Sequence, residues 1–335
     1  MRRLPCRKRG TGIQMNKLIS IDEYPVRNVL KMLLSDKTTG QNIRFATDAY
    51  SDVGIHAKTQ ITEEILFGSD PLLLQPRVCK SLSEQADRTK KKAEVFTPAW
   101  ICNKMNNHCD TEWFGREGIF NTEREQDWEP TSDPVPFDSK KTWQQYIDSR
   151  RLEITCGEAP YIASRYDAAT GEPIPVGRRI GILDRKLRVV NENTDNERDW
   201  TRWSVRAFQS VYGFEYQGDS LLIARINLVM TLAEYMQERW GKAPDLSLVT
   251  KIANIVAWNL WQMDGITGTV PYGMPVKQIT QYSFFDNVQV EQEPKPGDVD
   301  CMIYDWRSRR PVTYRSIKEH DHDTADKRNG EGVAK

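Results

Sequence analysis

Two short stretches of this 335-residue chain place an acid or a glycine turn directly after an apolar run. Residues 152–162 read LEITCGEAPYI, with a small polar turn at Gly157, and residues 211–216, VYGFEY, carry Glu215 near their end. A carboxylate at a strand end can accept hydrogen bonds from the two hydroxyls of a ribose, and a glycine lets a ligand approach the backbone closely. Taken alone, the first stretch fits an ordinary turn as well as a nucleoside-binding loop.

Strands that alternate with helices are expected to position these residues. The sequence predicts helices over 142–150, 176–210, 219–240 and 245–260, and strands over 152–154, 211–216, 298–304 and 310–317. The helix over 219–240 should be amphipathic, because its apolar residues recur at three- and four-residue steps: Leu222, Ile226, Val229, Ala233 and Met236. Such alternation is typical of an α/β fold with a parallel sheet, whose ligands bind beyond the carboxyl ends of the strands.

Composition limits the possible partners. Lys plus Arg and Asp plus Glu are both 47, so contact with DNA would depend on local patches such as RTKKK at 88–92 and the segment Arg307–Arg310. No run of about 18 apolar residues occurs, which predicts a protein without a membrane span. Six scattered cysteines without framework spacing predict reduced thiols in a cytoplasmic protein, and no metal site is predicted.

Four segments resemble, in the same order, the N6-adenine DNA methyltransferases of type I and type II restriction–modification systems. EVFTPAWICNKM at 94–105 is similar to the family's Phe-Thr-Pro segment, and LEITCGEAPYI is similar to its cofactor loop. YGFEYQGDSLLIARINLVM at 212–230 and NLWQMDGI at 259–266 resemble the two acid-bearing elements that follow. The resemblance covers roughly residues 88–306. It implies a Rossmann-like methyltransferase sheet with flanking helices, and the short remainder of the chain allows truncation after strand five.

The resemblance also implies which residues bind S-adenosylmethionine: Phe96, Thr97, Pro98, Glu153, Thr155, Cys156, Gly157, Glu215 and Asp264. Thr97 is expected to cap the following helix and Pro98 to open it. Glu153 would hold the methionine amino group, Glu215 the ribose and Asp264 the adenine ring. The loop is divergent, since Glu153 replaces the family's Asp and Ala159 replaces a second glycine. Asp264 before Gly265 fits an ordinary turn equally well.

The family's catalytic Asn/Asp-Pro-Pro-Tyr/Phe motif is absent, and DCMIYDWRS at 300–308 stands in its place. There Asp305 would accept a hydrogen bond from the adenine amino group, while Tyr304 or Trp306 would stack on the flipped base. This chemistry requires Asp305 to lie at the same cleft edge as Gly157 and Glu215. Without the resemblance, the two aromatic residues fit simple packing on a strand.

The chain is expected to comprise a basic flexible arm (1–14), an α-rich or mixed N-terminal region (15–92), a methyltransferase-like α/β domain (93–318) and a disordered tail (319–335). Two functions remain open. The first is an S-adenosylmethionine-dependent DNA adenine-N6 methyltransferase that modifies double-stranded DNA with a specificity or restriction subunit. The second is a catalytically silent methyltransferase-like subunit that binds DNA or a partner in a restriction or defence complex. The missing proline pair favours the second, and the cofactor elements favour the first.

Overall fold

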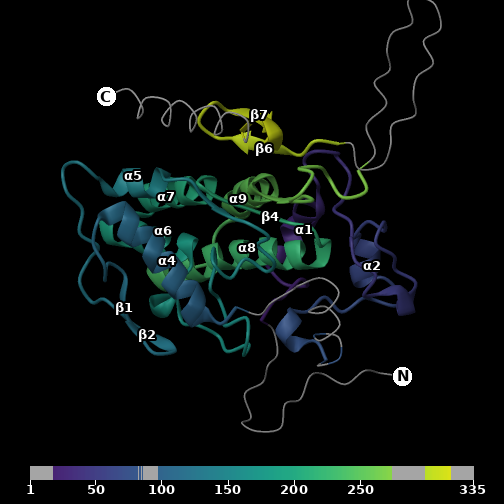
Figure 1. The fold of residues 1–335 in the computed structure, drawn as a ribbon, viewed down its shortest axis with the longest axis horizontal. Helices are drawn as coiled ribbons and strands as arrows, with labels where there is room; N and C mark the ends of the chain where they lie inside the picture. The colour runs from purple at the N-terminus through teal and green to yellow at the C-terminus, as the bar shows by residue number, and fades with distance from the viewer. Residues whose placement is uncertain (1–17, 82, 84, 86–96, 274–298, 318–335) are drawn as a thin grey trace, which may run out of the picture.

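The computed structural model describes residues 18–81, 83, 85, 97–273 and 299–317 (Figure 1). The predictions for the basic arm, the 88–92 patch, Phe96 and the 319–335 tail lie outside these residues. The α-helices are α1 (Val26–Leu34), α2 (Glu63–Phe67), α4 (Ala99–Phe114), α5 (Trp143–Asp148), α6 (Ile182–Asn193), α7 (Glu197–Gln209), α8 (Gly218–Trp240) and α9 (Leu246–Asn259). The strands are β1 (Asn121–Arg124), β2 (Asp127–Pro130), β3 (Arg151–Glu153), β4 (Val211–Glu215), β5 (Leu260–Gln262), β6 (Met302–Asp305) and β7 (Arg310–Thr313).

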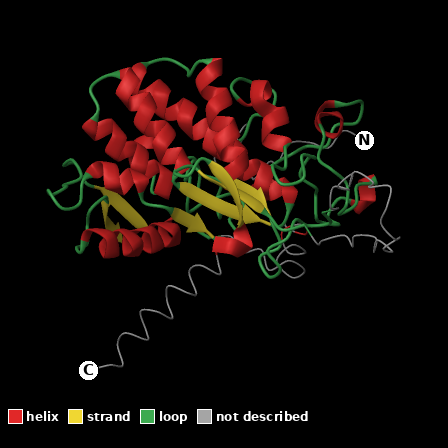
Figure 2. Ribbon diagram, turned by 90° about the horizontal axis from the view of Figure 1, so that it is seen from above, coloured by secondary structure: helices red, strands yellow, loops and turns green. Residues whose placement is uncertain are grey.

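Three short parallel strands form a sheet in the order β3–β4–β5. Helices α6 and α7 connect β3 to β4, and α8 and α9 connect β4 to β5, so that most helices lie on one side of the strands (Figure 2). Alternate residues of a strand face opposite sides, and Val211 accordingly belongs to the helix-covered core while Phe214 faces away from it. The expected α/β fold with a parallel sheet is therefore present, with three parallel strands in the described chain.

Helix α8 is the central helix, and the prediction that it is amphipathic is wrong. The predicted apolar face is buried apart from half-buried Ala233, but most of the opposite face is buried as well, including Arg225 and Asn227. The helix cannot be amphipathic in the ordinary sense, because α1, α6, α9 and β5 all pack around it.

The β6–β7 hairpin is a separate antiparallel sheet. It packs on the face of the parallel sheet that the helices leave open, where Ile303 and Cys301 join Phe214 and Trp261 in one apolar cluster. The segment that stands in place of the catalytic motif therefore covers the parallel sheet and does not extend it.

The N-terminal segment, which includes Val26, Leu30 and Phe45, packs into the helix-covered core. It also crosses the carboxyl ends of β4 and β5. Gly218 N–H donates to the Phe45 carbonyl at 3.0 Å, and Gln262 Nε2 donates to the Arg44 carbonyl at 2.7 Å. A Cβ at Gly218 would lie 2.0 Å from the Arg44 oxygen, so only glycine allows this close approach.

Candidate cofactor site at the carboxyl edge of the sheet

The loop after β3 has an unusual backbone. Thr155, Gly157 and Ala159 have φ angles of 51°, 53° and 63°, which is the left-handed region that residues with a Cβ seldom adopt. The Cys156 N–H donates to the Phe214 carbonyl at 2.8 Å, and a Cβ at Gly213 would lie 3.1 Å from Cys156 Sγ. Close packing against β4 thus fixes a strained loop. Backbone strain of this kind is concentrated at functional sites.

Glu153 lies at the end of β3 beneath this loop and is 9% exposed. Its Oε1 accepts a long hydrogen bond from Tyr161 N–H at 3.5 Å, whereas its buried Oε2 has no hydrogen-bond partner among the described residues. Burial raises the pKa of the Glu153 carboxyl well above its usual range, and the negative charge of Glu215 adds to the increase, although backbone N–H groups of Tyr161 and Ile162 oppose it.

Glu215 at the end of β4 fastens the loop to the neighbouring strand. Its Oε2 accepts from Gly157 N–H at 2.9 Å, and its Oε1 accepts from Gln217 N–H at 3.0 Å. Both oxygens of the carboxylate thus hold backbone N–H groups at the carboxyl edge of the sheet. The prediction that Gly157 and Glu215 come together is confirmed by this contact.

Asp264 follows β5, so that an acid stands at or just beyond the end of each parallel strand. Its Oδ1 accepts from Ile266 N–H at 2.8 Å and Thr267 N–H at 3.2 Å, which is the ordinary turn that the sequence also predicted. Both bonds use Oδ1, and Oδ2 retains its acceptor capacity. The side chains of Tyr216 and Tyr272 lie next to each other near Asp264. Sequence reasoning missed this aromatic pair, which is separated by more than fifty positions.

Helix α4 brings the Thr-Pro segment to the loop. The Thr97 side chain lies next to Tyr161, the residue whose N–H faces Glu153. The prediction that Thr97 caps the helix is wrong: the helix begins at Ala99, its N-cap residue is Pro98, and the Asp167 carboxylate accepts from Ala99 N–H at 2.7 Å. A carboxylate from a distant loop has replaced the local threonine.

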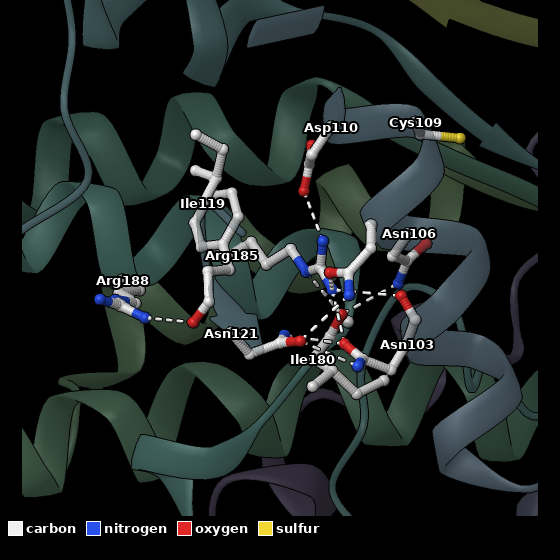
Figure 3. Close-up of polar contacts among 12 residues, drawn as sticks. Asn103, Asn106, Cys109, Asp110, Ile119, Asn121, Ile180, Arg185 and Arg188 are labelled. Atoms are coloured by element: carbon white, nitrogen blue, oxygen red, sulfur yellow. Dashed lines mark hydrogen bonds and ion pairs between the residues drawn. The ribbon is translucent and has the colours of Figure 1, made fainter. Parts of the chain in front are cut away.

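A buried polar network holds α4 in place (Figure 3). The guanidinium of Arg185 from α6 bonds Asp110 at 2.5 Å and the side-chain oxygens of Asn103 and Asn107 at 2.8 Å each. Asn103 and Asn121 also exchange two hydrogen bonds of 2.8 and 2.9 Å. Because Arg185 is only 2% exposed, these bonds replace its hydration.

The ARINL segment of α8 has a structural explanation that the sequence left open. Asn227 Nδ2 donates to the Glu158 carbonyl of the strained loop at 3.0 Å. Arg225 donates to the carbonyls of Leu33, Ser35 and Leu260, among others. Two polar residues within an apolar helix were the only signal of these contacts.

Asp305, Tyr304 and Trp306 do not lie at this edge. Trp306 Nε1 donates at 2.7 Å to Asn259, which immediately precedes β5, and Asp305 pairs at 2.9 Å with Arg150, which immediately precedes β3. These residues are at the amino ends of the strands, because β6 runs antiparallel to β5 and begins beside Gln262. The expectation that Asp305 shares a cleft edge with Gly157 and Glu215 is therefore wrong.

The rings of Tyr304 and Trp306 pack against each other at an interplanar angle of 51° with centroids 4.5 Å apart, and Tyr304 also contacts Trp258. Burial acts to raise the pKa of Asp305, but hydrogen bonds from Ser308 and Arg307 and the charge of Arg150 outweigh it, so the pKa is lowered. The segment is thus engaged in packing and ion pairing.

No protein-family model, no curated protein and no solved structure matches the chain. Within the described ranges, no helix combines the length and the apolar character that crossing a bilayer requires. The same residues contain no cluster of three His, Cys, Asp or Glu side chains that could hold a metal ion.

Proposed function

We propose that this chain is the S-adenosylmethionine-binding component of a DNA adenine-N6 methyltransferase or restriction complex, and that the acceptor group for the target adenine comes from outside its described residues. The observation that supports this most is Glu153 Oε2, an unpaired carboxylate oxygen buried at the carboxyl end of a parallel strand. Such an oxygen costs free energy unless a ligand satisfies it.

The residues at this edge fit the cofactor. An ammonium group next to Glu153 Oε2 would supply the missing hydrogen bond and would favour the carboxylate over the protonated acid. Glu215 lies at the end of the neighbouring strand, where its carboxylate would face a ribose, and Asp264 Oδ2 would accept from an adenine amino group. When bound, S-adenosylmethionine supplies an electrophilic methyl group on its sulfonium.

The position of Asp305 favours a component over a self-sufficient enzyme. Transfer to adenine N6 needs an acceptor for the amino hydrogens within about 3–3.5 Å of the reacting atoms. Asp305 lies at the other end of the strands and is paired with Arg150. A partner that binds double-stranded DNA and flips the base is the most direct source of the acceptor.

Calorimetry with S-adenosylmethionine tests the cofactor part of the proposal. The wild-type chain should bind it, Glu153→Gln should bind it more weakly, and Glu129→Gln on the exposed hairpin should bind it unchanged. Absence of binding by the folded wild-type protein would overturn the proposal.

Tritiated methyl transfer to unmethylated plasmid DNA tests the component part. The chain alone should transfer no methyl groups, and transfer should appear when the proteins encoded beside it are added. Transfer by the isolated chain would show that the acceptor is already present, and the component part would be discarded.

A further inference from the structure

A groove between α7 and α9 carries a row of basic side chains that the cofactor site does not use. Arg198, Arg202 and Arg206 occur at four-residue steps on α7 and therefore share one face of the helix. They line a hollow of about 650 Å³ together with Lys251 of α9. The two helices pack side by side, as Figure 1 shows.

The acids in this hollow are already committed to other groups, and three of the bases are not. The Asp148 carboxylate pairs with Arg206, and the Asp245 carboxylate caps α9 by accepting from Leu248 N–H at 2.8 Å. Arg198, Arg202 and Lys251 are exposed and form no ion pair with a carboxylate of the described chain. The groove therefore carries unneutralised positive charge in a chain whose net charge is zero.

A second basic segment adjoins this groove. Arg307, in the turn between β6 and β7, donates to the Asp148 carbonyl at 3.2 Å; the same turn carries exposed Arg309, and exposed Arg310 begins β7. Asp148 ends α5 shortly before β3 begins, so the combined surface starts at the end of the strands opposite the proposed cofactor loop.

We propose that the α7–α9 groove binds the phosphate backbone of a nucleic acid. Eight residues of helix separate Arg198 from Arg206, or about 12 Å. Along one strand of a duplex, about 12 Å of axis carries three to four phosphates. Hydroxyl groups of Thr201 and Ser247 also line the groove and can donate to phosphate oxygens. Because Arg206 is paired with Asp148, the free charge is carried by Arg198, Arg202 and Lys251. Three charges spread over both walls of the groove fit a polyanion better than a single small anion.

The binding is independent of sequence, because phosphates carry no base information. Since the groove is remote from Glu153 and Glu215, it cannot deliver a base to the cofactor loop. It would instead anchor the chain on nucleic acid, and it does not rest on the cofactor proposal.

Fluorescence anisotropy with a labelled 20-base-pair duplex of arbitrary sequence tests this between about 50 and 200 mM salt. The wild-type affinity should fall steeply with salt. The triple variant Arg198→Gln/Arg202→Gln/Lys251→Gln should bind at least tenfold more weakly, and the slope of log affinity against log salt should decrease by about 2–3. Because these side chains are exposed, the variant should fold and bind S-adenosylmethionine as the wild type does.

The matched control is Lys104→Gln/Arg116→Gln/Lys140→Gln, which removes the same charge from exposed positions away from the groove. It should keep the wild-type slope. Equal losses in the two triple variants, or wild-type binding that is flat across the salt range, would overturn the proposal. Displacement of the duplex by poly-glutamate as efficiently as by unlabelled duplex would assign the groove to an acidic polypeptide, and would overturn it too.

Discussion

Two buried polar clusters of this protein differ in how completely their hydrogen bonds are satisfied. Around Arg185, a guanidinium with 2% exposure meets one carboxylate and two side-chain amides (Figure 3). At the carboxyl edge, Glu153 is 9% exposed, yet its Oε2 has no hydrogen-bond partner in the part of the chain that the structure describes, and the adjoining loop has three residues with positive φ.

The difference supports a structural role for the first cluster and the proposed binding role for the second. A saturated network fixes one arrangement of α4, α6 and β1, since each member would be left unpaired if another moved. An unsaturated one lowers stability while nothing is bound, and proteins retain such groups mainly where function needs them. The Asn106 amide links the two clusters, because it donates to the carbonyls of Tyr161 and Ile180 at 3.0 and 2.9 Å. The rigid cluster thus supports the strained one.

The largest effect is expected from breaking the saturated network. Asp110→Ala should lower the free energy of unfolding by about 3–5 kcal/mol, because it leaves the Arg185 charge and the Tyr146 hydroxyl buried without their acceptor. Urea denaturation measures the change. The control is Asp127→Ala, whose partner Arg178 is 46% exposed and which should cost at most about 1 kcal/mol. Similar costs for the two variants would contradict a structural role for the network.

The next effect concerns the unsatisfied oxygen. Glu153→Gln should weaken S-adenosylmethionine binding by about 1.5–3 kcal/mol in calorimetry, because it removes a charge-assisted hydrogen bond. The same substitution should raise the free energy of unfolding at neutral pH. A loss of both affinity and stability would instead place Glu153 with the structural residues.

The pH dependence of stability tests independently whether buried Glu153 lowers the free energy of unfolding when it is charged. Burial raises the pKa of Glu153 in the folded protein, so the folded state retains a proton that the unfolded state has lost. Its contribution to the free energy of unfolding is therefore greatest below the unfolded pKa and falls as pH rises through the folded pKa. Glu153→Gln should remove this part of the decrease, which thermal unfolding across neutral pH would detect.

The sequence was sufficient to place three acids at one edge of the parallel sheet, but not to place the β6–β7 hairpin relative to that sheet. Glu153, Glu215 and Asp264 each follow a short apolar run, and parallel strands bring such ends to one edge. β6 pairs with β7, and the position of Asp305 depends on the face and the direction in which this hairpin packs on the parallel sheet. Local alternation of residues does not encode that packing. The Arg185 network was hidden for a similar reason. A charged helix looks solvated until its partners, about eighty positions away in α4, are known.

A smaller effect is expected from relaxing the strained loop. Thr155 is exposed with a φ of 51°, so Thr155→Gly should relieve strain without loss of buried surface and raise the free energy of unfolding by about 1 kcal/mol. Affinity for S-adenosylmethionine should decrease slightly, because the loop becomes less preorganised. Thr122→Gly, in exposed strand β1, should instead cost about 0.5–1 kcal/mol. The same sign at both positions would argue against strain in the loop.

The smallest effect is expected at Asp305, and it distinguishes the two ends of the sheet. Its pair with Arg150 is partly exposed, with side-chain exposures of 24% and 49%, so Asp305→Ala should change the free energy of unfolding by only about 0.2–1 kcal/mol. Affinity for S-adenosylmethionine should be unchanged, since Asp305 lies at the amino ends of the strands and the residues proposed to bind the cofactor lie at the carboxyl ends. In a reconstituted complex, methyl transfer should persist at a similar rate, because an acceptor group must lie within reach of the methyl group to affect the chemical step. Loss of transfer in Asp305→Ala with intact cofactor binding would mean that the β6–β7 hairpin moves to the other end of the sheet in the complex, and the acceptor would then belong to this chain.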